Sequence, residues 1–208
     1  MVKEGIPFVS IPLVIAVGFA IFQLWIPAAV FVFLCLFMAY FFRDPKRVIP
    51  TGPGLIVSAA DGRVTRIEEN EDGKLVSVFL SPLDVHINRS PIGGRITGIE
   101  YVRGKKLPAT NNSASFVNER NTLTIDGGGM SVKCTQIAGI LARRIVCWPV
   151  TGDNVERGQK FGLIKFSSRT DLLMPPDVRL EVKLGDRVRG GETIIARAAV
   201  SEDGNVKI

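Results

Sequence analysis

The chain has 208 residues, of which 46% are hydrophobic, and a formal net charge of +6. Its length fits one domain, or one domain with an appendage. The charges are unevenly distributed: residues 5–42 carry none, and only Lys3 and Glu4 precede them, so the whole positive excess lies on residues 43–208. A single histidine, His86, excludes a histidine-rich metal site. The chain lacks a basic run with interleaved aromatic residues, so nucleic-acid binding is not indicated.

The three cysteines, Cys35, Cys134 and Cys147, are odd in number and lack the spacing of metal ligands. This pattern suits buried thiols in a reducing compartment. We therefore expect neither a disulfide framework nor a bound metal.

Residues 8–42 form a nearly continuous apolar stretch. One straight helix of this length would reach roughly 52 Å, against about 30 Å of hydrocarbon in a bilayer. We therefore expect a break at residues 25–27 and two apolar helices, at about 6–24 and 28–42, that form a membrane-anchoring hairpin. A signal peptide fits poorly, because its apolar core would be much shorter.

The second expected helix is short for a full crossing, so a two-span hairpin and a re-entrant or interfacial hairpin both stay open. Arg43, Lys46 and Arg47 follow it directly and predict that this end faces the cytoplasm. A basic domain beside anionic lipid gains about 1 kcal/mol per well-placed cation. We therefore predict an anchor at residues 1–42 and a second domain at 43–208, on the cytoplasmic face of the cell membrane.

From residue 45 onward, prolines and glycines separate short runs rich in β-branched residues, which is the signature of strands. A short helix is expected only at residues 113–118. The domain is therefore predicted to be mainly β, as a compact sandwich or barrel. The expected strands lie at residues 55–58, 62–67, 74–80, 95–102, 121–126, 130–137 and 143–148.

A Gly-Asp-x-Val unit followed by arginine and glycine occurs at residues 152–158 and again at 185–190. We expect each copy to form a hairpin, with the first glycine at positive φ and the valine in the core. Such hairpins are typical of barrel-sandwich folds of the biotinyl/lipoyl type. The alternative is two merely similar hairpins, and no lysine at a hairpin tip indicates a carrier function.

Five short motifs follow one another along the chain. They are Arg43-Asp44-Pro45, Ala60-Asp61-Gly62, Leu80-Ser81-Pro82-x-Asp84-Val85-His86-x-Asn88-Arg89, Asn118-Glu119-Arg120-Asn121 and Phe166-Ser167-Ser168-Arg169-x-Asp171. Each is weak alone, because a turn carboxylate, a structural histidine and an exposed polar turn explain the main ones equally well. In this order, over essentially the whole chain, they resemble the short bacterial and archaeal form of phosphatidylserine decarboxylase.

The resemblance implies a self-cleaving proenzyme, cut between Ser167 and Ser168 into chains 1–167 and 168–208 that stay together as a heterodimer. Ser168 would become a pyruvoyl group. The implied reaction joins this group to phosphatidylserine of an anionic membrane as a Schiff base and releases CO₂ to leave phosphatidylethanolamine. A further dimer of this unit is also implied.

The resemblance also assigns roles to side chains. His86 would be the general base and acid, and Asp61 would orient it. Arg120 and Arg89 are weaker candidates for substrate binding, since arginine suits oxyanions. Two positions depart from the family pattern. Arg89 stands where longer forms have a second histidine, and Ser167 stands where the family has glycine, which tolerates the backbone strain that helps an amide rearrange.

Two other functions stay open. A non-enzymatic, membrane-anchored barrel-sandwich adaptor would explain the hairpin, the repeated unit and the basic surface. A serine hydrolase that uses Ser168, His86 and Asp61 fits less well, because the chain has no Gly-x-Ser-x-Gly elbow around that serine.

Overall fold

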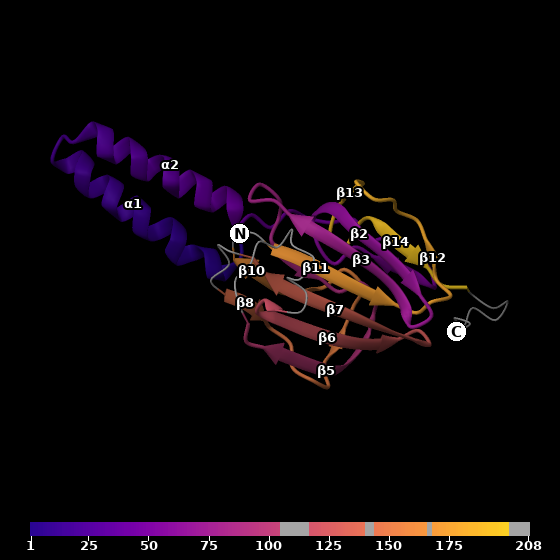
Figure 1. Cartoon of the computed structure of the whole chain (residues 1–208). Coiled ribbons are helices and arrows are strands. Elements are labelled where there is room, and N and C mark those ends of the chain that lie inside the picture. The colour runs from indigo at the N-terminus through magenta and orange to yellow at the C-terminus, as the bar shows by residue number, and fades with distance from the viewer. Residues whose placement is uncertain (105–116, 140–143, 166–167, 200–208) are drawn as a thin grey trace. The chain divides into compact units, whose positions relative to one another are not determined.

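The computed structural model describes residues 1–104, 117–139, 144–165 and 168–199 (Figure 1). It divides into two compact units, Met1–Lys46 and Arg47–Ile208. The short helix expected at residues 113–118 lies mostly outside the described residues, as does Ser167. The expected domain boundary after residue 42 and the expected cut before Ser168 stay predictions.

The first unit is a pair of apolar helices. A single 3-10 turn, η1 (Lys3–Gly5), leads into α1 (Ile6–Ile21), and α2 spans Trp25–Phe41. The rings of Phe19 and Phe31 stack between the helices with centroids 5.7 Å apart. By length and composition, η1 and α1 together form one helix that can cross a membrane, whereas α2 is shorter.

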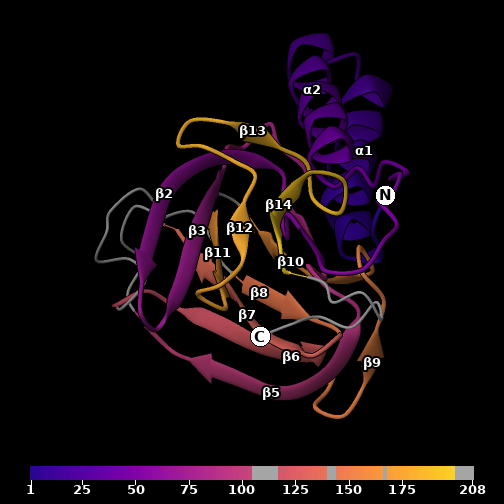
Figure 2. The ribbon, with the colours of Figure 1, turned by 90° about the vertical axis from the view of Figure 1, so that its right-hand side faces the viewer.

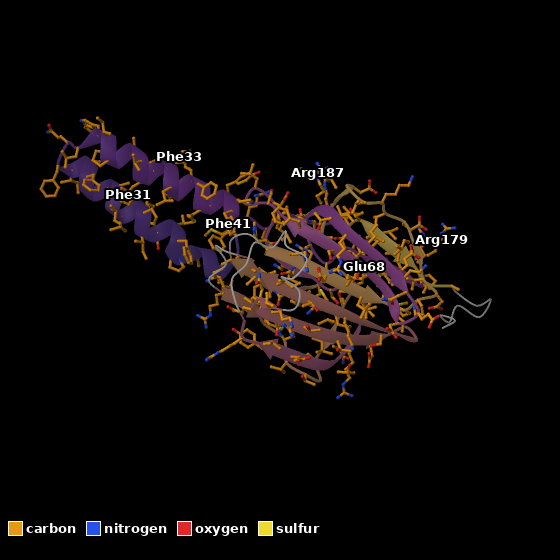
Figure 3. All side chains as sticks on the ribbon, in the orientation of Figure 1. Phe31, Phe33, Phe41, Glu68, Arg179 and Arg187 are labelled. Carbon is orange, nitrogen blue, oxygen red and sulfur yellow. The ribbon has the colours of Figure 1, made fainter. Side chains whose placement is uncertain are left out.

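The expected break between the helices at residues 25–27 is wrong. The chain turns at residues 22–24, where Gln23 takes a left-handed conformation with φ of 58°. Pro27 lies inside the first turn of α2, where its missing N–H removes no helical hydrogen bond. Apolar side chains such as Phe33, 73% exposed, project outward from the pair (Figure 3), as expected for a lipid-facing surface.

The second unit is built from antiparallel strands. An eight-stranded sheet with the order β13-β2-β3-β11-β7-β6-β5-β9 curls around the core, and two three-stranded sheets have the orders β1-β14-β12 and β4-β10-β8 (Figure 2). The strands are β1 Leu55–Val57, β2 Gly62–Asn70, β3 Gly73–Leu80, β4 Ile87–Arg89, β5 Gly94–Val102, β6 Arg120–Gly127, β7 Met130–Ala138, β8 Arg144–Cys147, β9 Asn154–Val155, β10 Lys160–Lys165, β11 Ser168–Met174, β12 Arg179–Leu180, β13 Arg187–Val188 and β14 Ile194–Arg197.

Side chains that alternate along these strands build the core. On β2, for example, Val64 is buried while its neighbours Arg63 and Thr65 are exposed. The same alternation on β6 and β7 buries Leu123 and Val132. Each of the seven expected strands is present with small shifts of its ends, so the mainly β prediction is confirmed. The barrel-sandwich interpretation stays a prediction.

The repeated Gly-Asp-x-Val units do not form hairpins, so that expectation is wrong. β9 and β13, which contain the two valines, pair instead with the beginnings of β5 and β2. The other two expectations are confirmed: Gly152 and Gly185 have φ of 102° and 92°, and Val155 and Val188 are buried.

The segment that carries the paired serines is a strand from Ser168 onward, and not an exposed polar turn. β11 pairs with β3 on one side and with β7 on the other, so it lies inside the eight-stranded sheet. Arg169 and Asp171 are only 2% and 6% exposed. An exposed turn was one of two interpretations of its polar composition, and the strands on both sides exclude it by burying this segment.

Candidate active site

Ser168 is the first residue of β11 and pairs with Leu80 of β3 and Ala138 of β7. It is fully buried, and its hydroxyl has no hydrogen-bond partner among the described residues. Leaving a buried hydroxyl without a partner costs about 1–3 kcal/mol. A cost of this kind in a native structure calls for an explanation.

His86 lies just before β4 and is 2% exposed. Its Nδ1 lies 2.9 Å from the main-chain carbonyl oxygen of Asp84. Because a carbonyl only accepts hydrogen bonds, Nδ1 carries the proton, and Nε2 is the basic nitrogen of the neutral ring. The turn itself is held by the Asp84 carboxylate, which accepts hydrogen bonds from the Ser81 amide and hydroxyl at 2.8 and 2.6 Å.

The Asp61 carboxylate has other partners than the one expected. It accepts two hydrogen bonds from Nη2 of Arg47, at 2.9 and 2.7 Å, and one from the Gly190 amide at 2.8 Å. In the described part of the chain it accepts none from His86. The expected orienting role of Asp61 therefore stays a prediction, and the Asp84 carbonyl occupies the position on Nδ1 that a carboxylate would take.

Asp61 nevertheless lies at the end of the sheet where β11 begins. Arg63 of β2 pairs with Phe79 of β3, and Phe79 pairs with Arg169 of β11. Asp61 stands two residues before Arg63 and is thus level with the beginning of β11. Two inter-strand spacings, about 10 Å in total, separate the two strands.

A chain of buried amides joins the strand that follows His86 to β11. Asn121 donates to Gln136 at 3.1 Å, Gln136 donates to Asn88 at 2.9 Å, and Asn88 donates to the Thr170 hydroxyl at 2.9 Å. All four side chains are buried. Asn88 and Thr170 each stand two residues after a proposed catalytic residue, so this network joins the two segments that contain those residues. None of these roles is evident from the sequence.

Asn118 and Glu119, whose motif had no derived role, support the strand beside Ser168. The side-chain amide of Asn118 donates to the carbonyl of Ala138 at 2.8 Å, and the Ala138 amide donates to the Glu119 carbonyl at 2.9 Å. Because Ala138 is the register partner of Ser168, these bonds fix the edge against which the serine lies.

The two arginines proposed for substrate binding are not neighbours in the sheets. Arg89 ends β4 and donates to the carbonyl of Gly158 at 3.0 Å, whereas Arg120 begins β6 and pairs with Ile137. Ile137 also pairs with Arg169, so Arg120 and Arg169 share one row of the sheet. Their binding roles stay predictions.

Arg169 forms a buried ion pair with Asp171, with 2.9 Å between Nε and Oδ1. Burial, followed by the nearby Asp171 carboxylate, raises the pKa of the Cys134 thiol well above its usual range. That thiol therefore stays protonated and is a poor nucleophile.

Comparisons with known proteins match this arrangement to one family. The family model described as phosphatidylserine decarboxylase matches residues 34–196. The chain belongs to the phosphatidylserine decarboxylase family. A relative from Symbiobacterium thermophilum is 49% identical over 94% of both chains, and one from Geotalea uraniireducens is 41% identical over 92% of this chain and 93% of its own. A third, from Pelodictyon phaeoclathratiforme, is 44% identical over 89% and 92%. All three are named phosphatidylserine decarboxylase proenzyme.

Arg47 is a further residue of the candidate site that could not be recognised from the sequence. It was assigned to the positive flank of the membrane segment, together with Arg43 and Lys46. Its side chain is 6% exposed and pairs with Asp61 and Glu192. No local pattern distinguishes it from its neighbours, because one partner is 14 and the other 145 residues away.

Proposed function

We propose that the chain is a self-cleaving decarboxylase that converts phosphatidylserine to phosphatidylethanolamine. The names of the relatives support this activity and do not support the non-enzymatic adaptor. The observation that carries the proposal is the buried Ser168 hydroxyl, which has no hydrogen-bond partner in the described part of the chain. A hydroxyl that no described neighbour holds is suited to attack the adjacent peptide bond.

Self-cleavage needs a base, and His86 is proposed to supply it. Ser168 Oγ attacks the Ser167 carbonyl carbon, and His86 Nε2 takes the hydroxyl proton. As the C–N bond breaks, that proton passes to the nitrogen of Ser168. An ester between Ser168 Oγ and the Ser167 carbonyl carbon then stands in place of the amide. Removal of the Ser168 Cα proton then forms a double bond between Cα and Cβ and breaks the Cβ–Oγ bond, which frees the Ser167 carboxylate. Finally Cβ takes up a proton, and water replaces the nitrogen, which leaves as ammonia.

The residues present fit a pyruvoyl group at position 168, because the side chain that would form it is buried and not hydrogen-bonded by described residues. When present, that group supplies a carbonyl that reacts with the substrate amine and withdraws electrons as CO₂ leaves. His86 is proposed to return a proton to the substrate carbon. The Asp84 carbonyl keeps the same ring nitrogen available for both steps.

The finer points of location and assembly belong to the same proposal. The apolar helices would anchor the protein, and Arg43 and Lys46 favour the cytoplasmic face of the membrane. The products 1–167 and 168–208 would remain one heterodimer, because β11 pairs with strands of the larger product on both sides. A further dimer of this unit rests on the family resemblance alone. A barrel-sandwich arrangement of the second unit is proposed with them.

Intact mass of the purified 22.7 kDa chain tests the proposal. We expect two products, 1–167 and 168–208, the smaller with a blocked N-terminus. Ser168→Ala and His86→Ala should each leave the chain whole. Ser167→Gly should cleave at least as fast as the natural sequence, because glycine tolerates the strained backbone that helps the amide rearrange.

A control variant, Ser77→Ala, removes another buried hydroxyl without a described partner, in β3, and should cleave normally. Ordinary two-chain maturation of His86→Ala would overturn the assignment of the base. A wild-type chain that stays whole, together with no CO₂ release from phosphatidylserine vesicles, would overturn the proposed function.

A further inference from the structure

Arg47 holds the Asp61 carboxylate through a buried contact. Its Nη2 lies 2.9 and 2.7 Å from the two carboxylate oxygens, and the side chains are 6% and 14% exposed. Charge-assisted hydrogen bonds of this kind are short and about twice as strong as neutral ones. Arg47 Nε is also buried without a partner among the described residues, so the placement of this arginine is costly for stability.

The contact joins segments from both sides of the proposed cut. Arg47 and Asp61 precede it, whereas Gly190 and Glu192 follow it. The Gly190 amide donates to Asp61 at 2.8 Å, and Glu192 accepts from Arg47 Nη1 at 3.3 Å and from the Val48 amide at 3.0 Å. A Cβ on residue 190 would lie 3.2 Å from Asp61 Oδ1, which is tighter than an ordinary contact, so glycine suits this close approach. Asp61 is therefore held by Arg47 from before the proposed cut and by Gly190 from after it, and Glu192 in turn holds Arg47.

An internal repeat shows that the fold itself does not require this carboxylate. Residues 58–68 and 90–100 share serine, glycine, arginine, threonine, isoleucine and glutamate at equivalent positions. Ser58 Oγ donates to the carbonyl two residues later at 2.7 Å, and Ser90 Oγ does the same at 2.6 Å. Each serine carbonyl also accepts a glycine amide, from Gly191 and Gly158, at 2.8 Å.

In the second copy, the place of Asp61 is taken by Gly93. The same turn thus forms without a carboxylate and without an arginine to hold it. The Arg47–Asp61 pair is therefore an addition to one copy of the repeat. That copy contains the residues at the end of the sheet where β11 begins with Ser168.

We propose that Arg47 is a positioning residue for self-cleavage, which keeps the Asp61 carboxylate fixed at the end of the sheet where the peptide bond before Ser168 is cut. The inference rests on the proposed function. The guanidinium acts through Asp61 and touches neither the peptide bond nor the phospholipid. Oδ2 of Asp61 accepts one described hydrogen bond, so it keeps a lone pair for a second donor.

Self-cleavage of the full-length chain tests this role, by denaturing gel and intact mass over time. We expect Arg47→Ala to slow cleavage about 100-fold, the loss typical of a catalytic group displaced by about 1 Å. Arg47→Lys keeps the charge and should cleave at an intermediate rate. Added guanidinium ion at non-denaturing concentration should restore Arg47→Ala, a rescue that a merely structural role would not give.

The matched control is Arg63→Ala, an exposed arginine on β2 whose Nη1 donates to the Gly185 carbonyl at 3.0 Å. It should cleave at the wild-type rate. Asp61→Asn should cleave slowly, and adding Arg47→Ala to it should slow cleavage no further, since both changes remove the same function.

Wild-type cleavage rates in a folded Arg47→Ala or Arg47→Lys would overturn the inference. If Arg47→Ala fails to fold, the Arg47→Lys rate and the double-variant comparison made with Arg47→Lys decide the question. A wild-type chain that does not cleave instead contradicts the proposed function, so the two failures are distinguishable.

Discussion

The acid–base chemistry of the site depends on which atom accepts a hydrogen bond from the His86 ring. A main-chain carbonyl, that of Asp84, accepts from Nδ1, and a carbonyl cannot donate. In the neutral ring, Nε2 is therefore the nitrogen that can act as the base. The Ser81–Asp84 turn supplies this carbonyl and is itself held by two short hydrogen bonds. A substitution of Asp84 would act on the histidine through the shape of the turn.

Glu192 gives a pH-dependent test at the same scale. The Val48 amide, followed by the charge of Arg47, lowers the pKa of Glu192 below its ordinary value of 4.5, although partial burial opposes this. Because the folded pKa is the lower one, the carboxylate stabilises the fold above about pH 4.5 and loses that contribution as the pH falls through the folded pKa. We expect Glu192→Gln to lower the melting temperature by about 2–4 °C at neutral pH and to have no effect at pH values below the folded pKa.

Thermal melts by circular dichroism from about pH 7 to about pH 3 measure this difference. Glu71→Gln, in the exposed turn between β2 and β3, is the control. A melting difference for Glu192→Gln that stays constant over the whole range would contradict the ion-pair explanation.

At the scale of elements, β11 is central to the eight-stranded sheet and to the proposed chemistry. It begins with the proposed reactive residue, and it pairs over seven residues with β3 and over six with β7. β14, which follows it in the chain, pairs with both β1 and β12. The two copies of the internal repeat frame this arrangement, since β2 and β5 each receive a short Gly-Asp-x-Val strand at their beginning.

This topology predicts that the chain 168–208 stays bound after cleavage. We expect the two products to co-elute in native size-exclusion chromatography and to separate only in strong denaturant. Leu172→Ala, which removes a buried side chain of β11, should weaken this association by about 2–5 kcal/mol and lower the melting temperature of the complex. Leu184→Ala, at a 67% exposed position, should have no such effect. Separation of the wild-type products in native buffer would contradict the role of β11.

The whole molecule combines two units with different surfaces. The helical unit exposes large apolar side chains, including Phe22 at 78% and Ile26 at 82%. The β unit exposes cations such as Arg179 and Arg187 (Figure 3). These surfaces predict two kinds of membrane attraction, of which only the electrostatic one is screened by salt.

Vesicle flotation separates the two contributions. We expect the full-length chain to float with vesicles at both low and about 1 M salt, where the Debye length falls to about 3 Å. A chain lacking residues 1–46 should float only with anionic vesicles at low salt. Release of the full-length protein by salt alone would contradict anchoring by the apolar helices.

Local patterns were sufficient for the apolar helices, the seven expected strands and the order of motifs that identified the family. Helices and strands are determined largely by residues a few positions apart, and hydrophobic runs and turn residues are patterns of the same range. The pattern was misleading where neighbours in space differ from neighbours in sequence. Residues 25–27 looked like a helix break, and an exposed turn was one of two interpretations of Ser168–Asp171.

The tertiary structure alone decided how the candidate residues are held. Arg47 was assigned to the membrane flank because its sequence neighbours are basic, yet its acceptors lie 14 and 145 residues away. Likewise, Asn88 reaches Thr170 across 82 residues, and nothing in the sequence around either one predicts the bond. Burial and hydrogen-bond geometry at this site depend on strands that meet only after folding, because sequence periodicity identifies the strands and does not specify which of them become neighbours.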